Sequence, residues 1–217
     1  MAGNGLVARK AFWTRGMAHL RKCDQRLAKI LRPESYRKIE LDADYYGAIV
    51  EAIVFQQLAG RAAEAILKKF KRLYNNRLPE PREFLRTKEH VVRSAGISPQ
   101  KYSYIKDLCQ RLDNGTLKLE ALGSMSDAEV IGELGKVKGI GRWTAEMFLI
   151  FSLGRPDIMP ADDLGVRKAI QKLCKLRELP DRKRVEALSR KWHPYCSIAT
   201  LCLWKSMDAV TVGNEQS

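Results

Sequence analysis

Residues 134–145 read Leu-Gly-Lys-Val-Lys-Gly-Ile-Gly-Arg-Trp-Thr-Ala, a Gly-x-Gly turn between two apolar runs. Upstream, Ser126-Asp-Ala-Glu129 has the pattern of a capping box, in which the serine and glutamate side chains bind each other's free amides and start a helix. Downstream, residues 142–153 resume the helical period, and Gly154 follows them as a stop signal. The segment predicts two helices joined by a tight hairpin over about residues 127–153.

The hairpin has glycine where a tight turn needs it. Gly139 and Gly141 tolerate positive φ and close backbone approach, and the turn exposes amides at a helix N-terminus, where a phosphate oxygen can bind. An ordinary corner between two helices would need the same glycines. Because Lys136, Lys138 and Arg142 flank the turn, the sequence favours phosphate binding, which positions a duplex without reading its sequence.

The rest of the chain also has the period of helices, and almost no segment alternates as a strand would. The sequence therefore predicts an all-α fold. Apolar spacing and stop signals predict further helices over residues 44–58, 62–74, about 99–115, 164–176, 181–191 and 195–208.

The composition points to a polyanionic partner. The 217 residues include 39 Lys and Arg against 25 Asp and Glu, a formal net charge of +14. Scattered solvated lysines could serve solubility alone, but the charge is patchy: residues 1–40 are strongly basic, whereas residues 41–60 carry three acids and no base. This distribution favours a polyanionic partner.

Five cysteines, an odd number without a CxxC pair, indicate reduced thiols inside a cell, and they lack the tight spacing of an iron–sulfur cluster. The sequence contains no apolar run of membrane-spanning length and no signal-peptide pattern, so we expect no membrane association. The expected location is the cytoplasm or nucleoid of a prokaryote, or the nucleus of a eukaryote.

A carboxylate pair, Asp162-Asp163, stands at the predicted start of the helix over 164–176. The conventional role of such a residue is to cap the helix, and this role is compatible with catalysis. A carboxylate at a helix N-terminus is favoured in its ionised form, which can stabilise positive charge developing on a sugar. If a glycosidic bond is cleaved, such a carboxylate would stabilise the oxocarbenium-like transition state.

Three segments together resemble the helix-hairpin-helix DNA glycosylase superfamily. They are Val137-Lys-Gly-Ile-Gly-Arg-Trp-Thr-Ala145, Pro160-Ala-Asp-Asp-Leu-Gly-Val166 and Ile53-Val-Phe-Gln-Gln-Leu58, in the order and spacing of the family over roughly residues 48–205. The chain is most similar to the alkylpurine branch, 3-methyladenine DNA glycosylase II of the AlkA type and its yeast relatives. Some bacterial AlkA-type proteins carry an additional N-terminal β domain, and we expect none here because the sequence has no room or pattern for it.

The resemblance implies two helical subdomains with a DNA-binding cleft between them. A six-helix barrel containing the hairpin would cover residues 45–155. Residues 1–44 and 156–217 would form a second helical lobe that carries the catalytic carboxylate.

The family pattern also implies roles for individual residues. It selects Asp163 as the catalytic residue and leaves the role of Asp162 open. Backbone carbonyls of Gly135, Val137 and Ile140 would hold a Na⁺ or K⁺ ion. The DNA-binding residues of the hairpin would be Lys138, Gly139, Ile140, Gly141 and Arg142.

Position 143 separates two chemistries. Glycosylases that also cleave the strand place a nucleophilic lysine there, whereas this chain has Trp143, which predicts a monofunctional enzyme with water as the incoming group. By resemblance, Trp143 and Trp204 are aromatic walls of the base pocket, and Met147 occupies a pocket position that is aromatic in some family members. Core packing is the alternative role for each tryptophan.

The resemblance places a wedge residue at Gln57, with Leu58 beside it, to fill the gap left by a flipped base; capping of a helix end is the alternative. The implied substrate is double-stranded DNA with 3-methyladenine or 7-methylguanine, bound by a monomer without a cofactor for the chemistry. Two other functions remain open: a non-enzymatic DNA-binding module, or a glycosylase for oxidised or mismatched bases.

Overall fold

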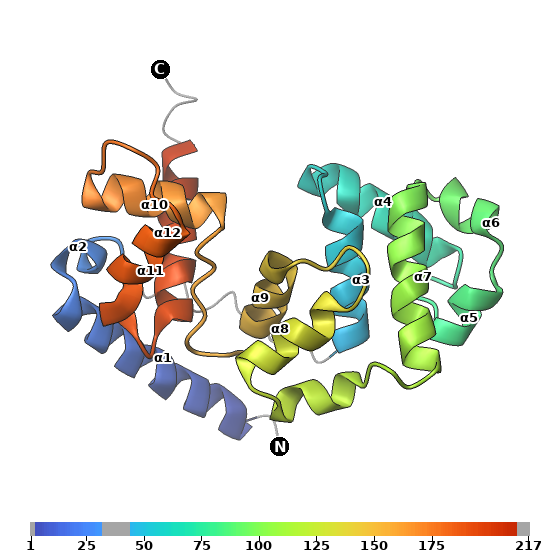
Figure 1. The fold of residues 1–217 in the computed structure, drawn as a ribbon, viewed down its shortest axis with the longest axis horizontal. Helices are drawn as coiled ribbons and strands as arrows, with labels where there is room; N and C mark the ends of the chain where they lie inside the picture. The colour runs from blue at the N-terminus through green and yellow to red at the C-terminus, as the bar shows by residue number, and fades with distance from the viewer. Residues whose placement is uncertain (1–2, 32–43, 212–217) are drawn as a thin grey trace. The chain divides into compact units, whose positions relative to one another are not determined.

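The computed structural model describes residues 3–31 and 44–211, with side chains over 11–31 and 44–207. These residues form helices and connecting turns without a strand, which confirms the all-α prediction for the described part (Figure 1). The chain divides into two compact units. We call Leu41–Leu153 the hairpin unit, and Met1–Glu40 with Gly154–Ser217 the terminal unit.

The hairpin unit contains seven α-helices and one 3-10 helix among its described residues. They are α3 (Tyr45–Phe55), α4 (Gly60–Arg72), α5 (Pro81–Arg86), α6 (Glu89–Ser94), α7 (Pro99–Asp113), η2 (Leu119–Ser124), α8 (Asp127–Gly135) and α9 (Arg142–Phe151).

Helix α3 lies at the centre of the hairpin unit. It packs against α4, α7 and α9, and α9 packs in turn against α8 (Figure 1). The core includes Ile53, Phe70, Ile105 and Leu149, all of which are fully buried. Burying such side chains stabilises the fold by about 1.5–3 kcal/mol each before the cost of ordering them. The packing fixes α3 beside the hairpin.

Local signals explain where the helices begin. The predicted capping box is confirmed at α8: the hydroxyl of Ser126 accepts from the Glu129 amide, and the Glu129 carboxylate accepts from the Ser126 amide. Helix α7 starts with Ser98 as N-cap and Pro99 in the first turn. Both features lie within four residues of sequence and can therefore be recognised without the fold.

The terminal unit contains five α-helices and one 3-10 helix among its described residues. They are α1 (Gly3–Cys23), α2 (Gln25–Ala28), α10 (Leu164–Cys174), α11 (Arg182–Ser189), η3 (Arg190–Trp192) and α12 (Cys196–Thr211).

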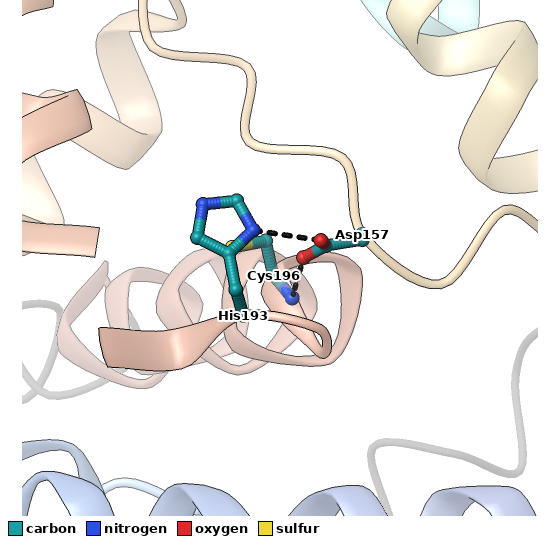
Figure 2. Close-up of side chains that lie close together, drawn as sticks. All are labelled: Asp157, His193 and Cys196. Atoms are coloured by element: carbon teal, nitrogen blue, oxygen red, sulfur yellow. Dashed lines mark hydrogen bonds and ion pairs between the residues drawn. The ribbon is translucent and has the colours of Figure 1, made fainter. Parts of the chain in front are cut away.

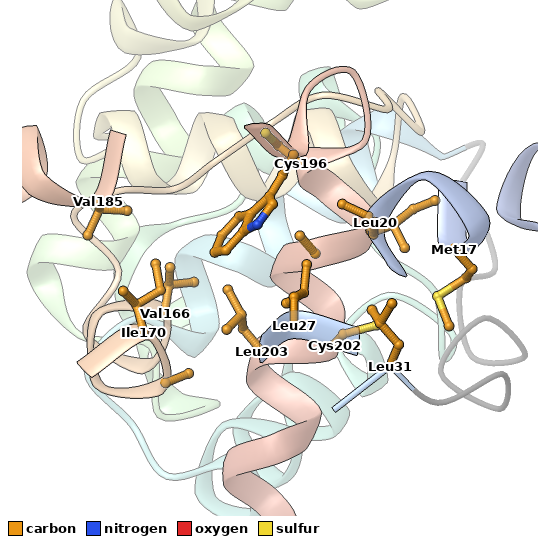
Figure 3. Close-up of a cluster of buried hydrophobic side chains, with 14 of the residues drawn as sticks. Met17, Leu20, Leu27, Leu31, Val166, Ile170, Val185, Cys196, Cys202 and Leu203 are labelled. Carbon is orange, nitrogen blue, oxygen red and sulfur yellow. The ribbon is translucent and has the colours of Figure 1, made fainter. Parts of the chain in front are cut away.

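Helix α12 is the centre of the terminal unit, because α10 and α1 both pack against it. Figure 3 shows side chains of α1, α2, α10 and α12, including Leu20, Leu27, Ile170 and Leu203, meeting in one apolar cluster. The indole of Trp192 is fully buried in the same cluster. Segments from the two ends of the described chain thus share a single core.

Several elements have no counterpart among the predicted ranges: α1, α2, α5, α6 and η2. Helices α5 and α6 have 6 residues each, so an apolar period of 3.6 residues cannot repeat twice in them. None of the described helices is both long and apolar enough to cross a membrane.

Candidate functional site

The hairpin turn needs glycine at one of its two positions. Gly139 has φ +78°, and a Cβ atom there would lie 2.1 Å from Cδ2 of Tyr104 on α7. Gly141 has φ −88°, and a Cβ atom there would meet nothing within 4 Å. Gly139 therefore shapes the turn itself, whereas the bare surface at Gly141 leaves room for a molecule outside the chain.

Two side chains from other helices hold the hairpin backbone. Oδ2 of Asp107 on α7 accepts hydrogen bonds from the amide of Lys138 (3.0 Å) and from Nε of Arg111 (2.8 Å). Burial of Asp107 acts to raise its pKa, but these two hydrogen bonds outweigh it and hold the pKa below its ordinary value. At the other side of the turn, Nε2 of Gln56 donates to the carbonyl of Gly139 (2.8 Å).

The amides of Gly139 and Gly141 have no acceptor within residues 3–31 and 44–211. Gly141 is also the N-cap of α9, and no side chain caps that helix. An unbonded pair of N–H groups at a helix N-terminus is the arrangement that binds phosphate. The Lys138 amide, which Asp107 already binds, is unavailable for that purpose.

The remaining hairpin residues differ in what they can offer a ligand. The side chain of Ile140 is buried, so this residue can offer a ligand only its backbone atoms, whereas the side chain of Lys138 is exposed. Arg142 pairs with the buried carboxylate of Glu146 one turn later on α9, at 2.9 Å from Nε. Glu146 thus orients a guanidinium group at the start of the helix.

The three carbonyls that the resemblance assigns to a cation belong to one short stretch, from the end of α8 to the start of α9. Gly135 is the last residue of α8, and the carbonyl of Val137 already accepts from the Ile140 amide at 3.1 Å. Carbonyl oxygens are hard donors that suit Na⁺ or K⁺, so the donor chemistry fits.

The segment after α3 has the geometry of an exposed, constrained loop. Gln57 is exposed and has φ +55°, a left-handed conformation that is uncommon for residues other than glycine. Leu58 beside it has 38% of its surface exposed. Gln57 caps no helix here, because α3 ends at Phe55 and Gln56 takes the C-cap position. The alternative reading of these glutamines as a simple helix cap therefore applies to Gln56 only.

A cavity of about 260 Å³ lies within the hairpin unit between α3 and α9. Its wall is mostly apolar and includes Ala52, Phe55, Met147 and Phe151, with Glu51 as its charged member. Met147 thus reaches this cavity, whereas Trp143 is not among the lining residues. With 47% of its surface exposed, Trp143 is not a core residue.

Asp163 stands at the start of α10 in the terminal unit. Its Oδ1 accepts from the Val166 amide at 2.7 Å and from Nε1 of Trp204 on α12 at 2.8 Å. Gly165 leaves room for this contact, because a Cβ atom there would lie 3.1 Å from both Oδ1 of Asp163 and Cδ1 of Trp204 and would crowd them. Capping and a precisely oriented carboxylate thus coexist at one residue.

Asp162 differs from Asp163 in its surroundings. It is exposed, and its Oδ2 binds Nη1 of Arg182 on α11 at 2.6 Å. The two adjacent acids therefore have different surroundings. Asp163 is held by hydrogen bonds within the terminal unit, whereas Asp162 forms a surface ion pair.

The supporting residues that the sequence did not indicate include Gln56, Tyr104, Asp107 and Gly165. Gln56 and Gly165 lie next to recognised residues and could have been suspected from position. Tyr104 and Asp107 are ordinary residues of α7, and nothing in their local sequence indicates that they hold a turn about 30 residues later. Their roles depend on the packing of α7 beside the hairpin.

Comparisons with protein families, curated proteins and solved structures all relate this chain to DNA repair proteins. Residues 50–194 match the family described as HhH-GPD superfamily base excision DNA repair protein, where HhH stands for helix-hairpin-helix. Among curated proteins, DNA-3-methyladenine glycosylase 1 of Schizosaccharomyces pombe is 34% identical over 198 residues, which cover 89% of this chain and 87% of that protein.

Two solved structures are similar over most of their length. The structure of 3-methyladenine DNA glycosylase Mag1 from Schizosaccharomyces pombe in complex with abasic DNA matches with a TM-score of 0.76 and 32% identity, covering 89% of this chain and 97% of that one. DNA-3-methyladenine glycosidase from Bacillus halodurans matches with a TM-score of 0.77 and 30% identity, covering 89% and 88%.

Proposed function

Because this chain belongs to the HhH-GPD superfamily of base excision DNA repair proteins, we propose that it is a monofunctional DNA glycosylase acting on alkylated purines. The substrate would be 3-methyladenine or 7-methylguanine in duplex DNA, and the products would be the free base and an abasic site. The observation that carries the proposal is Asp163, a carboxylate fixed by an amide and an indole N–H at the start of a helix. The names of the relatives support the choice of alkylated bases.

The chemistry assigned to Asp163 is electrostatic. As the bond between C1′ and the base nitrogen breaks, its electron pair leaves with the base and positive charge develops on the sugar. The ionised carboxylate stabilises that charge, and a water molecule then forms the new bond to C1′ and gives up a proton. A purine alkylated at N3 or N7 carries positive charge and leaves readily, so a strong general acid is unnecessary.

The hairpin would hold the DNA backbone. The unbonded amides of Gly139 and Gly141 would bind a phosphate, and Lys138 and Arg142 would add positive charge. The carbonyls of Gly135, Val137 and Ile140 would hold a monovalent cation that adds positive charge near the same phosphate. The chemistry at the sugar needs no cofactor.

The target base must leave the duplex before its sugar can be attacked. Unstacking costs a few kcal/mol, which a wedge can offset by filling the gap. We assign this wedge to Gln57, with Leu58 beside it, because both are exposed and Gln57 is held in a left-handed conformation.

The flipped base would be bound by aromatic and soft side chains. Trp143, Trp204 and Met147 are the candidates, and a ring face attracts a cationic base by about 0.5–2 kcal/mol. Because residue 143 is tryptophan, the position offers no amine for a Schiff base, so strand cleavage by that route is not expected. We propose that the enzyme works as a monomer in the compartment that holds genomic DNA.

Replacing Asp163 by asparagine tests this function. Asparagine keeps an oxygen that can accept from the Val166 amide and the Trp204 indole, so the fold should persist while the negative charge is lost. We expect release of 3-methyladenine and 7-methylguanine from methylated duplex DNA to fall about a hundredfold or more, measured by chromatography of the released bases.

Asp162→Asn is the matched control, because it removes an adjacent carboxylate that forms only a surface ion pair with Arg182 in the described contacts. It should leave release nearly unchanged. Equal release by wild type and Asp163→Asn would contradict the proposal, and DNA binding without release by the wild type would instead support a non-enzymatic DNA-binding module.

A further inference from the structure

A second polar cluster lies in the terminal unit. It consists of Asp157, on the segment that leads to α10, His193, just before α12, and Cys196, the first residue of α12 (Figure 2). One ligand atom of each residue lies within 4.8 Å of the other two. Nitrogen, oxygen and sulfur donors of this kind are the ligands of zinc.

The three ligand atoms converge on one side of the imidazole. Nδ1 of His193 lies 2.7 Å from Oδ2 of Asp157 and 3.6 Å from Sγ of Cys196. A nucleophilic relay would need the thiol and the carboxylate at different ring nitrogens, as in the serine hydrolase triad. Because both approach the same nitrogen, the arrangement suits a shared metal ion and not an activated thiol.

One of the ligand separations equals that of a tetrahedral zinc site. Zn–S and Zn–N bonds of about 2.3 and 2.05 Å at a tetrahedral angle place sulfur and nitrogen about 3.6 Å apart. The structure has this separation between Cys196 and His193. The same calculation requires about 3.3 Å between nitrogen and oxygen, so Asp157 must move away from His193 by about 0.6 Å when an ion replaces their hydrogen bond.

The surroundings hold the ligands in place. Oδ1 of Asp157 accepts from the Cys196 amide at 3.1 Å, which leaves Oδ2 facing the imidazole (Figure 2). The hydroxyl of Ser197 donates to the carbonyl of Arg155 and accepts from the amide of Ile158. These two hydrogen bonds link the backbone before and after Asp157 to α12. Cys196 is fully buried and the His193 side chain is 51% exposed, which leaves a solvent-facing position for a fourth ligand.

We propose that Asp157, His193 and Cys196 bind one Zn²⁺ ion, with water as the fourth ligand. Binding would deprotonate the Cys196 thiol and release its proton to solvent, so that the ion is held by a thiolate, an imidazole and a carboxylate. The ion would tie the segment before Asp163 to the start of α12. This site is independent of the proposed glycosylase function.

The test is a zinc titration of the full chain after removal of metal with a chelator. We expect one equivalent of Zn²⁺ to bind with a Kd of about 1 μM or tighter, and Co²⁺ in its place to give the visible absorption of a tetrahedral thiolate site. Zn²⁺ should also raise the melting temperature.

Two pairs of variants make the test specific. Cys196→Ser and His193→Gln should each weaken binding about tenfold or more. Their matched controls, Cys202→Ser, at a buried cysteine on the same helix, and His90→Gln, at an exposed histidine on α6, should bind as wild type. If Cys196→Ser does not fold, exposed His193 still decides the question. Absence of binding by wild type, or equal binding by wild type and His193→Gln, would overturn the proposal.

Discussion

The hydrogen bond from Trp204 to Asp163 gives the indole a positioning role in addition to the pocket wall that we propose for it. Trp204→Phe keeps an aromatic ring but removes the N–H donor, so Oδ1 of Asp163 loses this contact and keeps the one with the Val166 amide. A hydrogen bond to a charged group contributes about 1.5–3 kcal/mol. We expect single-turnover base release to slow by about tenfold or more while the Kd for DNA stays within about twofold.

Single-turnover kinetics and fluorescence anisotropy separate these two effects. If Trp204→Phe released bases at the wild-type rate, the indole would have no positioning role.

Asp24 shows how a buried carboxylate can stabilise the fold without serving the site. It is 3% exposed and accepts hydrogen bonds from Trp192 Nε1 (3.1 Å) and from the amides of Arg26 and Leu27, and it pairs with Lys191 at 2.8 Å. Burial acts to raise its pKa, but these contacts outweigh burial and lower the pKa from 3.8 to about 2.

A lowered folded-state pKa predicts the direction of the pH effect. The unfolded chain binds the proton more readily, so Asp24 stabilises the fold above about pH 4 by about 2 kcal/mol, and this stabilisation is lost as the pH falls toward 2. Urea unfolding followed by tryptophan fluorescence should show Asp24→Asn less stable than wild type at pH 7, with a difference that shrinks below pH 4. A difference that is constant from pH 7 to pH 2.5 would contradict this account.

At the scale of elements, we expect substitutions at the two hairpin glycines to have opposite effects on stability and DNA affinity. Gly139→Ala forces a side chain into positive φ and into the ring of Tyr104, so we expect a loss of about 2 kcal/mol or more in stability. Gly141→Ala meets neither problem, so its stability should change by less than about 0.5 kcal/mol, yet its DNA affinity should fall because the methyl group occupies the phosphate approach.

Chemical denaturation and DNA binding measured on the same two variants distinguish the roles. If Gly141→Ala bound DNA as tightly as wild type, the exposed amides of the turn would not contact phosphate. The pair is informative because both substitutions add one methyl group to the same turn.

Sequence predicted the elements whose signals are local. The capping box at Ser126 and the glycines of the turn place α8, the hairpin and α9 within a few residues of their observed bounds. It could not predict the contacts that support them, because Gln56 and Gly139 are 83 residues apart and Trp204 and Asp163 are 41 residues apart. Such pairs follow from packing between helices, which periodicity within one helix does not specify.

At the scale of the whole molecule, the net charge of +14 has a measurable consequence. Each phosphate neutralised by the protein releases counterions, so the logarithm of the association constant should fall by about 0.9 per log unit of salt for every phosphate contacted on duplex DNA. A protein that holds DNA through several lysines and arginines should therefore show a steep slope.

Lys138→Ala tests whether that slope arises at the hairpin. Lys138 is exposed beside the unbonded amides, so its removal should lower the slope by about 1 and weaken binding to all sequences equally. Lys88→Ala is the matched control, because Lys88 is an exposed lysine of the same unit at the start of α6 and its loss changes the net charge by the same amount. Anisotropy titrations from low to high salt should show a reduced slope in Lys138→Ala only. Equal reductions in the two variants would mean that the overall field of the protein, and not the hairpin, binds the duplex.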